Sequence, residues 1–317
     1  MASEERGRFA PSPTGELHLG NARTAILAWL WAKAARGGFT MRVEDLDRPR
    51  VRPGLAQRQL EELAWLGLTW DEGPDPRSGE DTGPRGPYRQ SQRDALYEAA
   101  IGKLGDHVYE CFCSRSEIAA ASAPHGPQDD GPRYPGTCAN LTLAQRAERR
   151  RTRAPALRLR VPRGPVRFTD ELKGPQEFDP AATVGDFVLR RADGVFAYQL
   201  AVVVDDAAME ITQVLRGDDL LPSTARQILL YRLLGLREPR RAHAGLVVAA
   251  SGERLSKRDR ASSLSTLRAS GRDPREVVSL LCAASGLPKL EGRSVAERVD
   301  TFALERIPPG SVRLGAV

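Results

Sequence analysis

A strand, a helix and a second strand follow one another near the start of the chain, and this pattern constrains the fold more than any other feature. Gly7–Ala10 indicates a short strand that stops at the turn Pro11–Gly15. Leu19–Ala35 is rich in Ala, Leu and Trp and ends at Gly37-Gly38, which predicts a helix. Phe39–Val43 predicts the next strand. Two strands joined by a crossover helix favour a parallel sheet, so the expected fold class is α/β.

Further helices and strands are expected around an irregular middle part. The predicted helices are Val51–Leu66, Gln92–Leu104 and Ser223–Leu234. The predicted strands are Ala156–Arg160, Val166–Phe168, Phe187–Arg190, Val195–Leu200, Gln199–Val204 and Glu210–Leu215. Residues 71–89 indicate a loop, Ala119–Arg133 is a low-complexity segment, and a polar loop after Ser251 precedes a helical tail. The chain is therefore expected to be an α/β domain interrupted by an insertion and followed by a small helical part.

Composition excludes several classes of protein. With 41% hydrophobic and 28% charged residues, the chain is neither collagenous nor a coiled coil nor wholly disordered. It has no apolar stretch of about 20 residues that could span a membrane, and its first residues, MASEERGRF, do not form a signal peptide. Four cysteines in such a chain indicate cytosolic thiols or metal ligands rather than a disulfide framework. A cytoplasmic protein without membrane contact is expected.

Basic residues are concentrated in one stretch. The net charge of the chain is +6, which permits a polyanionic partner without requiring one. Between Gln145 and Phe168 a single acid, Glu148, stands among arginines at positions 146, 149, 150, 151, 153, 158, 160, 163 and 167. This stretch is either a solvated basic surface or a face that contacts nucleic-acid phosphates.

The proline-rich loop before the first predicted helix offers an anion site. Backbone N–H groups at Leu19–Ala22 and the helix dipole favour a bound anion. Gly20 allows a ligand ring or phosphate to approach the backbone closely, and His18 offers a hydrogen-bond donor. Taken alone, the same residues also fit a plain turn with an exposed histidine.

The complete string Arg8-Phe-Ala-Pro-Ser-Pro-Thr-Gly-Glu-Leu-His-Leu-Gly-Asn21 is more specific. It closely resembles the ATP-binding signature of the glutamyl branch of class I aminoacyl-tRNA synthetases. Within it, His18–Asn21 is the counterpart of the class motif HIGH, and Asn21 departs from the final histidine at a position that varies within this branch. The resemblance implies a Rossmann-type parallel sheet and ATP, with Mg²⁺, as substrate.

A second motif lies far downstream, at Ser251-Gly-Glu-Arg-Leu-Ser-Lys-Arg258. Lys257 would place a compact positive charge near a leaving pyrophosphate, although such a loop alone could simply be solvated. It resembles the KMSKS loop of class I synthetases, with Arg254–Arg258 as counterpart. The resemblance implies that His18 and Lys257 are catalytic. It implies ATP binding by His18, Gly20, Asn21, Arg254, Leu255, Ser256, Lys257 and Arg258.

An acidic amino-acid substrate needs a buried cation for its side chain and an anion for its ammonium group. The resemblance implies that the glutamate pocket is formed by Arg8, Phe9, Ala10, Pro11, Ser12, Glu44, Tyr198 and Arg216. Each of these positions alone could equally be a surface ion pair or a core tyrosine. Supporting or capping roles are expected for Asp205, Asp206, Asp218 and Asp219.

Three of the four cysteines lie in one segment that could bind zinc. Cys111-Phe-Cys113 places two thiolates on one tight turn, Cys138 adds a third, and Tyr134 could supply a phenolate. His107 and His125 are rival fourth ligands, and free buried thiols are the alternative to a metal site. The pattern resembles the zinc site of glutamyl-queuosine tRNA(Asp) synthetases, which implies one structural Zn²⁺ per chain. Cys282 is expected in the core.

The length of the chain after the lysine loop differs from that of conventional glutamyl-tRNA synthetases. Discriminating glutamyl-tRNA synthetases carry a large helical anticodon-binding region after the lysine loop, whereas 59 residues follow Arg258 here. The resemblance implies that a monomer activates L-glutamate with ATP and transfers it to queuosine in the anticodon stem-loop of tRNA(Asp). Two alternatives are a truncated glutamyl-tRNA synthetase that charges a tRNA 3′ end and a non-catalytic tRNA-binding pseudo-synthetase.

The same resemblance predicts how the chain is divided. Residues 1–108 and 187–250 are expected to form the two halves of the catalytic domain. Residues 109–186 are expected to be an insertion with the zinc site and an acceptor-binding region. Residues 251–317 are expected to hold the lysine loop and a helical stem-contact region without an anticodon-binding domain.

Overall fold

Four parallel strands form the central sheet of the protein. The computed structural model describes residues 5–121, 133–248, 263–289 and 291–314. The strand order is β11-β10-β1-β2, and all three pairings are parallel. The strands are β1 (Arg6–Phe9), β2 (Gly38–Met41), β10 (Gln213–Gly217) and β11 (Arg240–Ala244). The predicted parallel α/β class and the opening strand–helix–strand unit are therefore confirmed.

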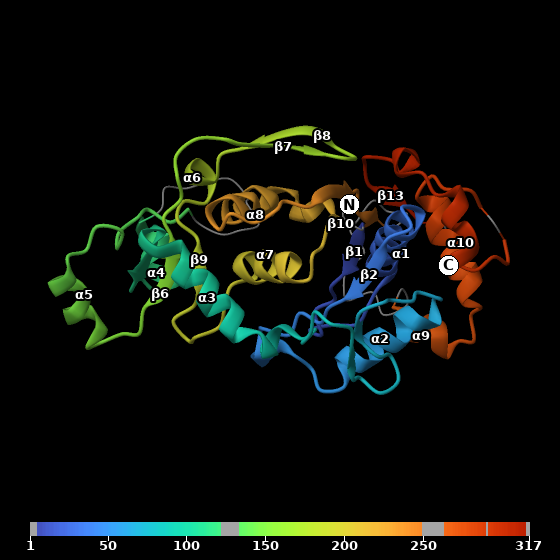
Figure 1. The fold of residues 1–317 in the computed structure, drawn as a ribbon, viewed down its shortest axis with the longest axis horizontal. Helices are drawn as coiled ribbons and strands as arrows, with labels where there is room; N and C mark the ends of the chain where they lie inside the picture. Colours follow the sequence, from blue (N-terminus) through green and yellow to red (C-terminus); the bar gives the residue numbers. More distant parts are fainter. Residues whose placement is uncertain (1–4, 122–132, 249–262, 290, 315–317) are drawn as a thin grey trace.

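Helix α1 (Leu19–Ala34) is the helix of that unit and is buried along most of its length. It contacts β1 and β10 on one side and α10 (Pro274–Ala284) on another. In Figure 1, α1 and α10 lie to the right of the sheet. Arg23 of α1 ties these parts together, because its guanidinium donates to Ser285 Oγ at 2.7 Å and to the Gly245 carbonyl oxygen at 2.6 Å.

The opposite side of the sheet carries α7 (Tyr198–Ala208) and α8 (Leu221–Leu233), which pack on each other and, through α7, on α3 (Asp94–Leu104) (Figure 1). The strands predicted at Val195–Leu200 and Gln199–Val204 are wrong. Before α7 there is only an isolated bridge between Arg190 and Phe196. The valine-rich run is buried on all sides, and a short buried apolar run has the same composition in a helix as in a strand.

Other predicted boundaries shift for local reasons. The helix predicted to start at Val51 begins instead as α2 (Leu55–Trp65), after the short 3₁₀ helix Arg48–Arg50. Gly54, at a φ of 74°, takes the left-handed conformation that precedes it. The loop expected at 71–89 contains two-residue strands, β3 (Gly73–Pro74) and β4 (Asp81–Thr82), and a 3₁₀ turn follows at Gln90–Gln92.

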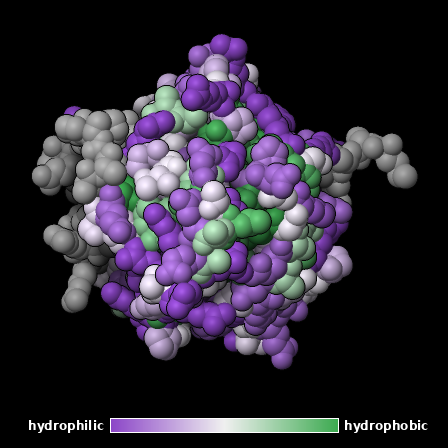
Figure 2. Space-filling view, turned by 90° about the vertical axis from the view of Figure 1, so that its left-hand side faces the viewer, coloured by the Kyte–Doolittle hydropathy of each residue, from purple (hydrophilic) through white to green (hydrophobic). Residues whose placement is uncertain are grey.

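The end of the molecule away from α10 carries a small antiparallel sheet with the order β5-β6-β9 (Figure 1). The strands β7 and β8 pair as a hairpin that lies above α8 and contacts β11 of the central sheet (Figure 1). The elements are β5 (Val108–Cys111), α4 (Arg115–Ala121), α5 (Leu143–Arg150), β6 (Ala156–Leu159), β7 (Val166–Asp170), β8 (Gly174–Phe178), α6 (Pro180–Thr183) and β9 (Val188–Arg190). Figure 2 views this end face-on, and hydrophilic residues predominate there around smaller hydrophobic areas.

The carboxyl-terminal part returns to the central sheet. It contains α9 (Leu264–Ala269), α10, short 3₁₀ turns at Ala296–Thr301 and Leu304–Arg306, and β13 (Val312–Arg313), which pairs in parallel with β12 (Val247–Val248). The backbones meet so closely that a Cβ on Gly245 would lie 1.9 Å from the Gly310 oxygen. Cys282 is buried as expected. In the part of the chain that the structure describes, no helix is long and apolar enough to cross a membrane.

The core around α1 predicts a clear stability difference between two leucines. Leu27 is fully buried in the main cluster, whereas Leu143 of α5 is 82% exposed. We expect Leu27→Ala to lower the free energy of unfolding by about 2–5 kcal/mol, because it leaves a cavity, and Leu143→Ala to change it by less than about 0.5 kcal/mol. Urea unfolding followed by circular dichroism measures both. Similar losses for the two variants would contradict the described packing.

Candidate active site

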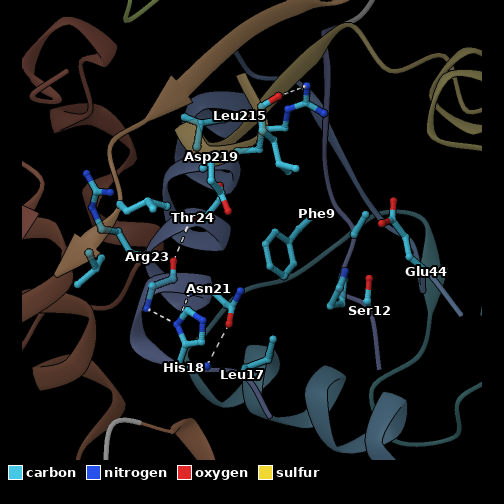
Figure 3. A pocket seen from close by; sticks show the side chains of 18 of the residues that line it. Phe9, Ser12, Leu17, His18, Asn21, Arg23, Thr24, Glu44, Leu215 and Asp219 are labelled. Carbon is cyan, nitrogen blue, oxygen red and sulfur yellow. Dashed lines mark hydrogen bonds between the residues drawn. The ribbon is translucent and has the colours of Figure 1, made fainter. Parts of the chain in front are cut away.

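A cavity of about 420 Å³ lies where the chain leaves the carboxyl ends of β1 and β10. These are neighbouring strands, but β1 connects onward to β2 while β10 connects to β11 on the other side. Open α/β sheets bind ligands at such a switch point, because the loops diverge there and leave a crevice. Figure 3 shows Phe9 between the His18–Asn21 side of the cavity and the Ser12–Glu44 side.

The structure brings the predicted pocket residues to this one cavity. Its lining includes Arg8, Phe9, Ala10, Pro11, Ser12, His18, Gly20, Asn21, Glu44, Tyr198 and Arg216. Three separate parts of the chain supply them: the loop after β1 with the start of α1, the segment after β2, and the α7–β10 region. The predicted ATP-binding residues Arg254, Leu255, Ser256, Lys257 and Arg258 lie outside the described residues.

His18 caps the helix that it precedes. Its Nδ1 accepts hydrogen bonds from the backbone N–H groups of Gly20 (3.1 Å) and Asn21 (3.4 Å). The Asn21 carboxamide oxygen accepts from the His18 N–H at 3.2 Å, which completes a capping box. A Cβ at residue 20 would lie 2.9 Å from the imidazole. The His18 ring thus lies close to Gly20, and the cap engages the backbone N–H groups of Gly20 and Asn21. The binding of ATP at these residues stays a prediction.

Behind the cavity lies a fully buried arginine, Arg42. Its Nη1 donates to Asp206 Oδ1 at 2.7 Å and its Nη2 to Glu44 Oε1 at 3.1 Å. Asp206 also accepts from Arg8, at 3.3 and 3.5 Å. Burial opposes ionisation of Asp206, but the charges of Arg8 and Arg42 outweigh it and lower the pKa of this carboxyl. Asp206 therefore supports Arg8 and Arg42 as an anion, the role expected for it.

Glu44 differs from Asp206 although both contact Arg42. Burial raises the pKa of Glu44, and the charges of Arg42 and Arg8 only partly oppose this. A cationic group entering the cavity next to Glu44 would favour its ionised form. The carboxylate is thus suited to receive an ammonium group.

Asp205 anchors α7 to the segments behind the cavity. It accepts from Arg93 Nε at 2.6 Å, from Gln90 at 2.7 Å and from the Tyr97 hydroxyl at 2.9 Å. Sequence reasoning assigned Asp205 a supporting role but did not find these three partners. They lie more than 100 residues away in the chain, and no local motif marks them.

The guanidinium of Arg216 is held at the cavity by four neighbours. Nε donates to His243 Nε2 at 2.9 Å, and Nη2 donates to Thr224 Oγ1 at 2.8 Å and to the Leu220 carbonyl at 3.3 Å. Nη1 donates to the Tyr198 hydroxyl at 3.4 Å. Arg216 is therefore a fixed cation in the cavity wall, as recognition of a carboxylate requires.

Ten cavity residues were missed from the sequence. They are Leu17, Arg23, Thr24, Leu215, Gly217, Asp219, Leu220, Gly245, Leu246 and Val247. Asp219, expected only to support or cap, belongs to the lining itself. Five of the ten follow the carboxyl ends of β10 and β11, and two more, Leu215 and Gly217, lie in the last part of β10. A correct strand order would have pointed to these seven. Asp218 does have a supporting contact, because it forms an ion pair with Lys173 at 2.7 Å.

A second candidate site lies at the far end of the molecule. The sulfur atoms of Cys111, Cys113 and Cys138 all lie within 4.8 Å of one another. Cys113 Sγ is 3.6 Å from Cys138 Sγ, and the Tyr134 hydroxyl oxygen is 3.3 Å from Cys111 Sγ and 4.0 Å from Cys113 Sγ. A tetrahedral zinc with Zn–S bonds of about 2.3 Å needs sulfurs about 3.8 Å apart. These donors therefore fit a zinc ion.

Two positively charged side chains lie beside the cysteines and could balance the negative charge of thiolate ligands. The Arg158 guanidinium lies 3.8 Å from the centre of the Tyr134 ring, and Arg149 Nη1 donates to Cys138 Sγ at 3.6 Å. Both cations offset the charge of thiolate ligands. Of the rival ligands, His107 is exposed and outside the cysteine group, and His125 lies outside the described residues.

Comparison with known proteins identifies relatives over nearly the whole chain. Residues 5–304 match the family described as class I tRNA synthetases (E and Q), catalytic domain. The chain is 51% identical to the glutamyl-Q tRNA(Asp) synthetase of Symbiobacterium thermophilum, covering 98% of this chain and 96% of that protein. It is 44% identical to glutamate–tRNA ligase 1 of Halorhodospira halophila, but covers 64% of that longer protein.

A solved structure supports the same relationship. The glutamate–tRNA synthetase of Elizabethkingia anophelis superposes with a TM-score of 0.84 at 29% identity, over 99% of this chain and 68% of that chain. The expected enzyme class, a synthetase that acts as a ligase, agrees with these relatives. The chain therefore belongs to the glutamyl and glutaminyl group of class I tRNA synthetases and, within that group, to the glutamyl-Q tRNA(Asp) synthetase family.

Proposed function

We propose that this enzyme activates L-glutamate with ATP and transfers it to the queuosine base in the anticodon of tRNA(Asp). The observation that carries the proposal is the meeting of Arg8, Glu44 and Arg216 around one cavity at the switch point of the sheet. Two cations and one buried acid match the two carboxylates and the ammonium group of glutamate. A relative that is 51% identical over nearly its full length bears the corresponding name.

The reaction has two steps. A carboxylate oxygen of glutamate attacks the α-phosphorus of ATP, forming a P–O bond while the bond to the β-phosphate breaks and pyrophosphate leaves. A hydroxyl of the queuosine cyclopentenediol then attacks the carbonyl carbon, forming an ester as AMP leaves and the hydroxyl gives up its proton. Mg²⁺, when bound, would neutralise part of the triphosphate charge.

We assign the protein groups as follows. Arg216 and Arg8 bind carboxylate oxygens, and Glu44 receives the ammonium group. We expect His18 and Lys257 to interact with the phosphates. Because Nδ1 of His18 accepts from the helix backbone, the proton of the neutral ring is on Nε2, which is the donor that we assign to the nucleotide. Lys257 lies outside the described residues and keeps the role that its motif implies.

The test of the function is labelled-glutamate transfer to queuosine-modified tRNA(Asp), unmodified tRNA(Asp) and tRNA(Glu), alongside ATP–pyrophosphate exchange. We expect glutamate-dependent exchange, transfer only to the modified tRNA(Asp), and loss of acceptance after periodate cleaves the cyclopentenediol. A modified anticodon stem-loop alone should suffice as acceptor, because the target base is single-stranded.

Other outcomes of this assay would favour one of the two alternatives. Charging of the 3′ end of tRNA(Glu) would identify a truncated glutamyl-tRNA synthetase. Binding of tRNA without any pyrophosphate exchange would identify a pseudo-synthetase.

We also propose that Cys111, Cys113, Tyr134 and Cys138 hold one structural zinc ion, and that residues 109–186 form an inserted unit around it. Four protein ligands leave no open position for a water molecule, so zinc here would stabilise the segment rather than take part in the chemistry. The geometry that supports this is the clustering of three sulfurs and one phenol oxygen.

Metal analysis tests the zinc site. We expect about one zinc per chain in enzyme purified without chelator, and a large loss of zinc in Cys111→Ser, since that variant removes one of four ligands. Cys282→Ala is the matched control, because Cys282 is buried in another cluster, where burial raises the pKa of its thiol to about 11. Tyr134→Phe tests the fourth ligand, and unchanged zinc affinity in this variant would assign that position to another group. Wild-type enzyme without zinc would refute the site.

We propose that the exposed arginines of the insertion contact tRNA phosphates. The side chains of Arg150 and Arg151 are 57% and 77% exposed and form surface ion pairs with Glu110 and Glu148. Such pairs contribute little to stability and can be exchanged for phosphate contacts. Arg158 is different, because it is buried against Tyr134.

The double variant Arg150→Ala/Arg151→Ala tests this surface. We expect a higher KM for tRNA and a salt dependence of binding that is less steep by about one unit per lost phosphate contact, with unchanged pyrophosphate exchange. Arg275→Ala is the control, since Arg275 is 56% exposed and also ion-paired but belongs to α10. Arg149 is left intact because it contacts Cys138. Equal effects of the double variant and the control would contradict the proposal.

A further inference from the structure

Two residues outside the cavity lining form a chain of hydrogen bonds to Arg216. Asp170 ends β7 and His243 lies in β11, and both side chains are fully buried. Asp170 Oδ2 is 2.6 Å from His243 Nδ1, and His243 Nε2 is 2.9 Å from Arg216 Nε. The imidazole therefore stands between a carboxylate on one side and the cavity arginine on the other.

The partners determine which ring nitrogen of His243 carries the proton. An arginine Nε–H can only donate, so Nε2 of His243 must be an acceptor, and the Thr224 hydroxyl, 3.1 Å from the same nitrogen, can then donate to it. The proton of the neutral ring is then on Nδ1, where the carboxylate of Asp170 accepts it. Burial, which outweighs the opposing effect of Asp170, lowers the pKa of His243 to about 4, in agreement with a neutral ring at neutral pH.

We propose that His243 is a positioning residue for Arg216 and that Asp170 holds His243 in the tautomer that this requires. The inference rests on the proposed role of Arg216 in binding glutamate. With Nε bound to His243 and Nη2 bound to Thr224 and Leu220, the guanidinium is fixed along one edge. Among the described residues, Nη1 has a single long bond, 3.4 Å to the Tyr198 hydroxyl, so this nitrogen retains donor capacity for a carboxylate.

The structure makes Asp170→Asn an unusually specific probe. Asp170 Oδ1 accepts three backbone N–H groups, from Leu172 and Lys173 at 3.0 Å and from His243 at 3.2 Å. An asparagine must keep its oxygen at that position, because an NH₂ group there would face three donors. Its NH₂ group then faces His243 Nδ1, which makes Nδ1 the acceptor and moves the ring proton to Nε2, against Arg216 Nε–H.

ATP–pyrophosphate exchange measures the effect on each substrate. For Asp170→Asn we expect the KM for glutamate to rise about tenfold or more, since a buried donor pair is left mismatched, and the KM for ATP to change less than about twofold. Asp71→Asn is a control for the same substitution away from the cavity. Asp71 is half-exposed and accepts one backbone N–H and one side-chain donor, from Phe39 and Lys33, which do not line the cavity.

A pair of variants at residue 243 separates positioning from packing. His243→Gln keeps an acceptor near the place of Nε2, whereas His243→Asn keeps only a donor near the place of Nδ1. We expect the glutamine variant to retain a KM for glutamate closer to wild type than the asparagine variant. Two results would show that His243 has only a structural role and does not position Arg216. One is the same KM for glutamate in the two variants, and the other is an equal rise in the KM for glutamate and for ATP.

Nuclear magnetic resonance observes the tautomer directly. The chain has four histidines, so the His243 signals in ¹⁵N-histidine-labelled enzyme can be assigned with His243→Gln. We expect a proton on Nδ1 in the wild type and on Nε2 in Asp170→Asn. A wild-type ring protonated on Nε2 would overturn the inference. Wild-type enzyme without glutamate-dependent exchange would instead overturn the proposed function.

Discussion

The burial of Arg42 is the constraint on which the rest of the site depends. A cation removed from water in this way is tolerated only with matched anions and good geometry, and the structure supplies Asp206 and Glu44 at hydrogen-bond distance. Asp206 extends the pairing to Arg8, so the loop after β2, the helix α7 and the strand β1 are held in one arrangement. The ion pairs that offset the cost of burying Arg42 also hold the cation Arg8 and the acid Glu44 at the cavity. The rear of the site is therefore organised before any ligand arrives.

Much of the site could be predicted from sequence because its residues are carried by short motifs. The string from Arg8 to Asn21 fixes a strand end, a loop and a helix start, and these stay together in any fold that keeps the motif. Glu44 comes from the segment after β2, and Tyr198 and Arg216 come from the α7–β10 region; family resemblance supplied their grouping. The topology explains that grouping, since β1 and β10 are parallel neighbours whose carboxyl ends share one edge, while the chain continues from them to opposite sides of the sheet.

The features that sequence did not reveal depend on long-range packing. The run that became α7 was mistaken for strand because valines favour both a strand and the buried interior of a domain. Asp170 and His243 carry no local signal, and their contact exists only because β7 lies beside β11. The surroundings of Gly20 also depend on packing: the sequence does not show that the His18 ring lies against this glycine, and the role of Gly20 in ATP binding stays a prediction.

The contact between Gly245 and Gly310 has a consequence for how the enzyme is made. Gly245, Leu246 and Val247 line the cavity, and among the described residues β12, which contains Val247, pairs with β13, with Val312 opposite Val247. The ribosome delivers the chain from its amino terminus. The cavity wall at β12 therefore lacks its partner strand β13 until residue 313 has left the ribosomal exit tunnel. The four strands of the parallel sheet are complete once residue 244 is available, whereas the cavity wall at β12 gains its partner strand only after residue 313.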